Sequence, residues 1–137
     1  MDFEDCVRKR IVKEVSLDED LINSLFKTSK NRFDSGEKLE LSEVTSASKI
    51  SLLYDSLREL LESLALKNKF KIYNHECYTY FLKEILNKEN IAEEFDDIRK
   101  IRNSINYYGK EISVDETKEI LERIRNLRKE VLRIYSV

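Results

Sequence analysis

The sequence predicts an all-α fold: one domain over residues 1–137, built as an antiparallel bundle of four to six helices. Two features of composition point to this fold. The chain has no proline and only two glycines, so it offers few places where a helix would break. Charged residues make up 38% of the chain and hydrophobic residues 41%, which is typical of amphipathic helices with a solvated outer face. Long helices joined by short connections pack as an antiparallel bundle.

The charge balance and the cysteines limit the class of protein. With a net charge of −2 and a pI near 5.6, the chain is not a broadly basic nucleic-acid binder, so any RNA contact must come from a local patch. We expect no signal peptide, since the chain opens on acidic residues, and no membrane span, since it has no apolar run of about 18 residues. Cys6 and Cys77 have no partner spacing and are predicted to be reduced thiols of a cytoplasmic protein. Abundant Lys and Glu without any glutamine are features of thermophilic proteins.

The first two predicted helices follow from apolar spacing and from a capping motif. Ser16 and Glu19 form a capping box for a helix that is expected to run to about residue 33 and to end at the turn-forming residues 34–36. Before it, a short helix over residues 2–15 is predicted by apolar residues that recur every four positions: Val7, Ile11 and Val15.

A long central helix is predicted over residues 42–67, after a linker at 37–42. The chain then turns at residues 67–73, and Asn74 caps a fourth helix over residues 75–88, whose buried line includes Cys77. The central helix keeps a helical apolar period over five turns: Ala47, Ile50, Tyr54, Leu57, Leu61 and Leu64.

The last two helices have well-marked ends. The fifth is expected to end at Gly109, because glycine suits the left-handed position that follows a helix. Ser113 and Glu116 form a second capping box, and the last helix then continues to about Tyr135. The second half of that helix is basic and is a candidate surface for a protein partner: Arg123, Arg125, Arg128, Lys129 and Arg133.

Arg102 departs from ordinary helix patterning. It lies inside the apolar stripe of the fifth helix, and an arginine there is costly unless it is paired or works at an interface. Two structural explanations are also open: a stem that lies along apolar surface with its head in water, or an ion pair inside the bundle. The stripe consists of Ile91, Phe95, Ile98 and Ile105, and three polar residues lie along its edge: Arg99, Asn103 and Asn106.

The segment 102–108, which reads Arg-Asn-Ser-Ile-Asn-Tyr-Tyr, resembles the HEPN superfamily, as does the helix order. Members of that superfamily are small α-helical bundles, usually dimeric, and many carry an Arg-x(4–6)-His motif near the end of a late helix. The resemblance implies a homodimer with metal-independent ribonuclease chemistry in a cleft between protomers, and it requires no cofactor. Several members are toxins paired with a nucleotidyltransferase antitoxin, and others are inactive partner modules.

The chain departs from this motif at the histidine, whose position is taken by Tyr107 or Tyr108. A phenol with a pKa of about 10 does not move a proton near neutral pH as an imidazole does, although it can bond a phosphate or stack on a base. The resemblance places Arg102, Tyr107 and Tyr108 in the catalytic positions. The two tyrosines also suit the edge of the core or a dimer contact. Polar neighbours along the helix are expected to bind the ligand: Arg99, Asn103 and Asn106.

His75 is the only histidine and opens the fourth helix. It is either a ligand-binding residue that serves as a substitute base at the dimer cleft, or a surface or capping histidine. We expect no metal site from His75, Glu76 and Cys77, because adjacent residues on a helix point in different directions.

Three hypotheses for function follow. The first is a dimeric HEPN-like domain that binds RNA or a nucleotide through Arg102 and acts as a degenerate ribonuclease of toxin–antitoxin type. The second is a protein-interaction module without catalysis, which pairs with a nucleotidyltransferase or another partner. The third is a structural bundle in which Arg102 is buried against an acidic side chain of its own chain.

Overall fold

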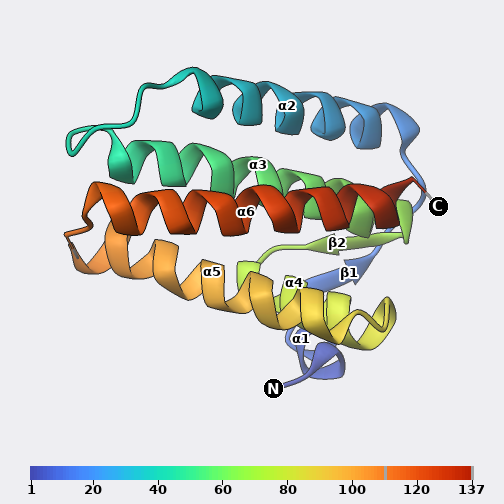
Figure 1. Cartoon of the computed structure of the whole chain (residues 1–137). Coiled ribbons are helices and arrows are strands. Elements are labelled where there is room, and N and C mark those ends of the chain that lie inside the picture. Colours follow the sequence, from blue (N-terminus) through green and yellow to red (C-terminus); the bar gives the residue numbers. More distant parts are fainter. Residues whose placement is uncertain (110, 137) are drawn as a thin grey trace.

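Four long helices form the body of the molecule (Figure 1). The computed structural model describes residues 1–109 and 111–136. Helix α3 (Ser46–Lys67) lies in the middle and packs against α2 (Glu19–Lys38), α5 (Glu89–Tyr108) and α6 (Val114–Tyr135). The prediction of a helical bundle with a central helix is therefore confirmed. In the described ranges, no helix is both long and apolar enough to cross a membrane.

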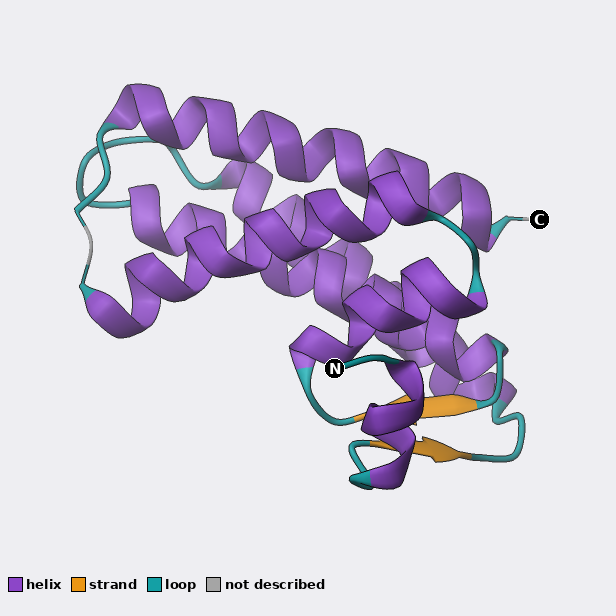
Figure 2. Ribbon diagram, turned by 90° about the horizontal axis from the view of Figure 1, so that it is seen from below, coloured by secondary structure: helices purple, strands orange, loops and turns teal. Residues whose placement is uncertain are grey.

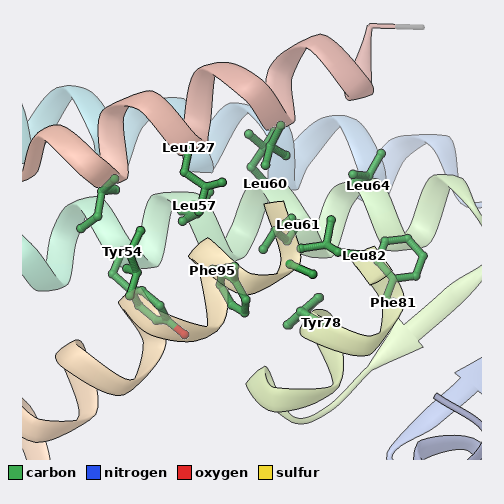
Figure 3. Packing of buried hydrophobic residues seen from close by; sticks show 14 of the residues in the cluster. Tyr54, Leu57, Leu60, Leu61, Leu64, Tyr78, Phe81, Leu82, Phe95 and Leu127 are labelled. Carbon is green, nitrogen blue, oxygen red and sulfur yellow. The ribbon is translucent and has the colours of Figure 1, made fainter. Parts of the chain in front are cut away.

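The core connects the central helix to α5 and to the short helix α4 (His75–Tyr80). A π-helical turn, η1 (Phe81–Ile85), continues α4, so the predicted fourth helix consists of two pieces. Phe95 of α5 stacks on Tyr54 of α3 with ring centroids 6.0 Å apart, and it meets Tyr78 of α4 edge-on at 6.3 Å (Figure 3). These rings fix the three helices that carry the site described below.

A two-stranded antiparallel sheet lies at one end of the bundle (Figure 2). Strand β1 (Val12–Glu14) pairs with β2 (Phe70–Ile72) in a register that places Val12 opposite Ile72. Both of these side chains are buried. The all-α prediction therefore holds for the bundle and misses this small sheet.

The predicted helix over residues 2–15 is wrong beyond its first turns. Helix α1 (Phe3–Arg8) ends there because Arg10 takes a left-handed backbone conformation, with a φ of 62°. The chain then extends into β1, where the β-branched Val12 suits a strand. Val7, expected on the apolar side of that helix, is exposed.

Helix α2 runs through the stop that was predicted at residues 34–36. Gly36 is buried near its end, where the missing side chain lets α2 approach Leu52 and Leu53 of α3. Lys49 of α3 is also buried there, and its ammonium group donates hydrogen bonds to carbonyl oxygens at the end of α2, the shortest of them 2.6 Å from the Gly36 oxygen. Carbonyl groups at a helix end carry partial negative charge, which stabilises this buried cation.

Three predicted helix ends are confirmed together with their capping residues, and others shift by a few residues. Helix α2 is capped by Asp18 rather than by Ser16, and α3 begins at Ser46 rather than at residue 42. The confirmed ends are the Asn74 cap of α4, the left-handed Gly109 after α5, and the Ser113 capping box of α6.

The prediction that both cysteines are reduced thiols is wrong. Cys6 of α1 and Cys77 of α4 form a disulfide, and both residues are fully buried. They are 71 residues apart in the chain and meet because α1 packs beside α4. Disulfides are rare in the cytosol outside hyperthermophilic organisms, so this bond weighs against the predicted cytoplasmic location.

Candidate functional site

Tyr54 connects two of the residues that the sequence singles out. It is fully buried on α3, because it continues the apolar period of that helix. Its hydroxyl oxygen lies 3.1 Å from Nδ1 of His75 on α4, and the guanidinium carbon of Arg102 on α5 lies 5.0 Å from the centre of its ring. One buried ring therefore holds Arg102 and His75 in a single cluster.

Arg102 lies between α5 and α3, in agreement with its position in the apolar stripe. Its side chain is only 12% exposed, and its Nη2 atom lies 3.6 Å from Oδ1 of Asp55 on α3. The third hypothesis, a structural bundle, predicted that Arg102 is buried against an acidic side chain of its own chain, and Asp55 fits that prediction. The separation exceeds the about 2.7–2.9 Å of a direct charge-assisted hydrogen bond.

Two further arginines lie on the same helices as Arg102 and Tyr54. Arg99, one turn earlier on α5, donates two hydrogen bonds to Oδ1 of Asp96, at 2.8 and 3.2 Å. Arg58 on α3 lies 3.9 Å from Glu62 on the same helix. Both arginine side chains are largely covered by their neighbours, so their positions are well defined before any ligand arrives.

The surroundings of His75 keep its imidazole neutral at pH 7. The pKa of His75 is lowered to about 4, first by burial and then by the guanidinium groups of Arg58, Arg102 and Arg99, while Glu62 acts in the opposite direction. His75 is half-buried and lies in the first turn of α4, as predicted. The charges of three guanidinium groups therefore act on one uncharged imidazole.

The buried phenols of the cluster remain protonated. Burial raises the pKa of Tyr54 and of Tyr78 above the ordinary value for a phenol. These tyrosines can therefore form hydrogen bonds but cannot accept a proton as a base near neutral pH. The neutral imidazole of His75 has a ring nitrogen that can accept a proton, although its lowered pKa makes it a weaker base than an ordinary histidine.

The cluster includes some of the predicted ligand-binding residues and not others. Arg99, Arg102 and His75 come together, and Asn103 lies partly buried one position after Arg102. Asn106 instead bonds across to α3, with its amide atoms 3.1 and 3.2 Å from Oγ of Ser51. The side chains of Tyr107 and Tyr108 lie outside the described part of the chain, so their predicted catalytic positions stay predictions.

Sequence analysis missed the contribution of α3 to the site. Tyr54 was assigned to the core alone, and three charged residues of the same helix were not singled out: Asp55, Arg58 and Glu62. A signal was present, because Tyr54, Arg58 and Glu62 recur every four residues and therefore share one face of the helix. That face borders the leucine stripe and turns toward α4 and α5.

Charges within the cluster nearly balance. The three arginines are matched by three carboxylates: Asp55, Glu62 and Asp96. Lys100 also contacts Asp96, at 3.0 Å, and Lys71 contacts Glu62, at 2.9 Å. The site is therefore a preorganised polar network with a modest excess of positive charge at its edges, and not an open cationic patch.

The basic second half of α6 is mostly engaged inside the molecule. Arg123 forms two hydrogen bonds to Glu94 of α5, and Arg125 forms two to Glu37 of α2. The guanidinium carbon of Arg128 lies 4.5 Å from the ring centre of Phe33. These contacts tie α6 to its neighbours and leave less of the predicted partner surface available.

The described residues include no group of three His, Cys, Asp or Glu side chains that could hold a metal ion. The sulfur of Cys77 is already bonded to Cys6.

Comparison with protein-family models, with curated proteins and with solved structures finds no match to this chain. A functional assignment therefore has to come from the geometry of the cluster and from the motif around Arg102.

Proposed function

We propose that the chain is a HEPN-like domain that binds RNA or a nucleotide through a phosphate group held by Arg102. One observation carries the proposal: Tyr54 contacts both His75, the only histidine of the chain, and Arg102, and the charges of Arg58, Arg99 and Arg102 all act on His75. A guanidinium group can donate two parallel hydrogen bonds to the oxygens of one phosphate group. The three arginines are already held in place by their neighbours. Asn103 adds an amide next to Arg102.

The same arrangement supports metal-independent cleavage of RNA as the reaction. In such a reaction the 2′-oxygen of RNA bonds to the adjacent phosphorus while the bond from phosphorus to the 5′-oxygen breaks. One proton leaves the 2′-hydroxyl group, and another reaches the 5′-oxygen. His75 is the group that we assign to proton transfer, because a phosphate bound among the arginines would offset the positive charges that lower its pKa.

Cleavage and binding of a mixed RNA pool in the presence of EDTA test the proposal. We expect Arg102→Ala to weaken binding and to abolish any cleavage, and His75→Ala to abolish cleavage while binding remains. Arg133→Ala, which removes an exposed arginine of α6, is the control for loss of one positive charge. Unchanged binding by the Arg102 variant would remove this residue from the site.

A non-catalytic protein-interaction module is the second candidate, and the near balance of charge in the cluster favours it. Matched charges give specificity to a contact between proteins more readily than they attract a polyanion. The partner would be a nucleotidyltransferase, as in toxin–antitoxin pairs. Co-expression of the chain with a nucleotidyltransferase encoded beside it, followed by co-purification, tests this candidate; separate elution of the two proteins would reject it.

A homodimer is part of the proposal, because the implied reaction takes place between two protomers. Light scattering during size-exclusion chromatography would measure the mass directly, and a monomer at all accessible concentrations would reject the shared cleft.

A cytoplasmic location is proposed only for a thermophilic source. The absence of glutamine points to such a source, and intracellular proteins of hyperthermophiles often contain disulfides. That source would reconcile the Cys6–Cys77 bond with an intracellular RNA ligand.

A further inference from the structure

The outward face of the β1–β2 sheet carries an unusual set of side chains. Lys13 and Lys71 lie directly opposite each other in the antiparallel register. Like charges in directly opposed positions of a sheet repel each other, so this pair lowers the stability of the strands. The positive charge of Lys71 is compensated by Glu62, which lies 2.9 Å away. Lys13 is exposed to solvent.

Tyr73 completes that face. Its N–H group donates a hydrogen bond to the carbonyl oxygen of Ile11 at 2.8 Å, so its backbone continues the pairing of β1 with β2. Its ring is 59% exposed, and the ammonium nitrogens of Lys13 and Lys71 lie 5.6 and 5.8 Å from the ring centre. A large aromatic ring is thus held at the surface between two cations, where burial contributes little to folding.

This face is continuous with the arginine cluster. Tyr73 is two residues before His75, so their Cα atoms are no more than about 7 Å apart. On the other side, Glu62 contacts both Lys71 at 2.9 Å and Arg58 at 3.9 Å. A chain of neighbouring polar groups therefore leads from the sheet to the arginines.

We infer that Lys13, Lys71 and Tyr73 form a second subsite, which binds the nucleotide next to the one held at Arg102 in single-stranded RNA. The base stacks on the Tyr73 ring, and its phosphate lies at Lys13 and Lys71. Exposed aromatic rings between basic side chains bind single strands in this way, because every base has a face that can stack. The inference rests on the proposed function and specifies its ligand as an unpaired strand.

Fluorescence anisotropy with a labelled RNA of about ten nucleotides tests the subsite, with the same sequence as a duplex for comparison. We expect Tyr73→Ala to weaken single-strand binding roughly tenfold and duplex binding little, because bases in a duplex are not free to stack on the ring. Tyr73→Phe keeps the stacking face and should bind within about twofold of the unaltered protein. Thermal unfolding of each variant verifies that the exposed positions leave the fold intact.

The salt dependence of binding tests the phosphate contact separately. We expect Lys13→Ala to reduce the slope of log affinity against log salt by about 0.7, the contribution of one contact to a single strand. Lys27→Ala, an exposed lysine on α2 at the opposite side of the bundle, should leave the slope unchanged (Figure 1).

The outcomes separate this subsite from the proposed function. Loss of binding in Arg102→Ala with no effect of Tyr73→Ala would overturn the subsite and keep the proposed function. Weakened binding in Tyr73→Ala and Lys13→Ala with no effect of Arg102→Ala would keep the subsite and overturn the role of Arg102. If Tyr73→Phe and Tyr73→Ala weakened single-strand binding equally, the hydroxyl group alone would contribute to binding, and the proposed stacking of a base on the Tyr73 ring would be overturned.

Discussion

His75 gives a direct spectroscopic test of the cluster, because it is the only histidine in the chain. Burial and the three arginines place its pKa at about 4. In a pH titration followed by NMR, its ring protons should shift with a midpoint near that value, and a bound nucleotide phosphate should move the midpoint upward. Arg102→Ala should also raise the midpoint, because it removes a nearby positive charge. A midpoint of about 6.5 with and without ligand would contradict the packing described for His75.

The same shift has a consequence for stability. The pKa of His75 is lower in the folded protein than in the unfolded chain, where it is about 6.5. Between about pH 6.5 and pH 4, His75 is therefore protonated in the unfolded chain but not in the folded protein, and protonation favours unfolding. The free energy of unfolding is thus highest above pH 6.5 with respect to this residue, and it decreases as the pH falls from about 6.5 to 4. In His75→Gln, the loss of stability over this interval should be smaller, as measured by urea unfolding.

Asp55 separates a ligand-binding role of Arg102 from a purely structural one. If Arg102 binds a phosphate as proposed, the Asp55 carboxylate, 3.6 Å from the guanidinium group, competes with that phosphate. We expect Asp55→Asn to raise affinity for a nucleotide phosphate several-fold, measured by calorimetry, and to lower the free energy of unfolding by at most about 1 kcal/mol, because the pair is partly exposed. Asp97→Asn on α5 is the control with the same change of charge. A large loss of stability without any gain in affinity would favour the structural role.

Among single residues, sequence patterns reveal those that break a pattern and do not reveal those that fit one. Arg102 could be selected because an arginine interrupts an apolar stripe, and His75 because it is the only histidine. Tyr54 could not be selected, since it follows the core period of α3 and only its neighbours on other helices give it a polar role. The cluster depends on how α3, α4 and α5 pack, and local spacing carries no information about that packing.

Gly36 controls how closely two elements approach. A methyl group added there would overlap Cδ1 of Leu53 and lie 3.2 Å from Cβ of Leu52. Replacing glycine by alanine in a helix gains about 1 kcal/mol in propensity, but overpacking a buried contact costs about 1–3 kcal/mol. Leu53 is fully buried and has little room to move, so Gly36→Ala should lower the free energy of unfolding by about 1 kcal/mol. Ser35→Ala, exposed on the same helix, should be neutral or slightly stabilising in the same denaturant titration; equal effects of the two changes would contradict the close approach.

Helices could be predicted where the signals are local, and strands could not. Asn74, Gly109 and Ser113 act on the backbone within a few residues, so the ends that they mark agree with the structure. The strands β1 and β2 have three residues each, and each depends on a partner from a distant part of the sequence. The four-residue spacing of Val7, Ile11 and Val15 therefore imitated a helix, because nothing nearby indicated the pairing.

The disulfide acts on the whole molecule. It closes a loop of the chain that contains β1, α2, α3 and β2, with 71 residues separating Cys6 from Cys77. Reduction should lower the free energy of unfolding by about 2–4 kcal/mol, because the unfolded chain then gains conformational freedom. Denaturant titrations with and without a reducing agent measure this difference, and the double variant Cys6→Ser, Cys77→Ser, which cannot form the bond, should show no response to the reductant. Alkylation of two thiols in the unreduced, unfolded protein would contradict the bond itself.

The buried ammonium group of Lys49 provides a natural probe of how often the molecule opens. Acylating reagents modify amines that solvent can reach, and Lys49 becomes reachable only when the end of α2 moves away from α3. Exposed Lys27 on α2 reacts in the folded protein and gives the reference rate. The ratio of the two modification rates, followed by mass spectrometry of peptides, would report the local opening free energy of this helical pair without any engineered label. We expect nucleotide binding at the site proposed around Arg102 to leave the ratio unchanged unless the ligand stabilises the whole bundle.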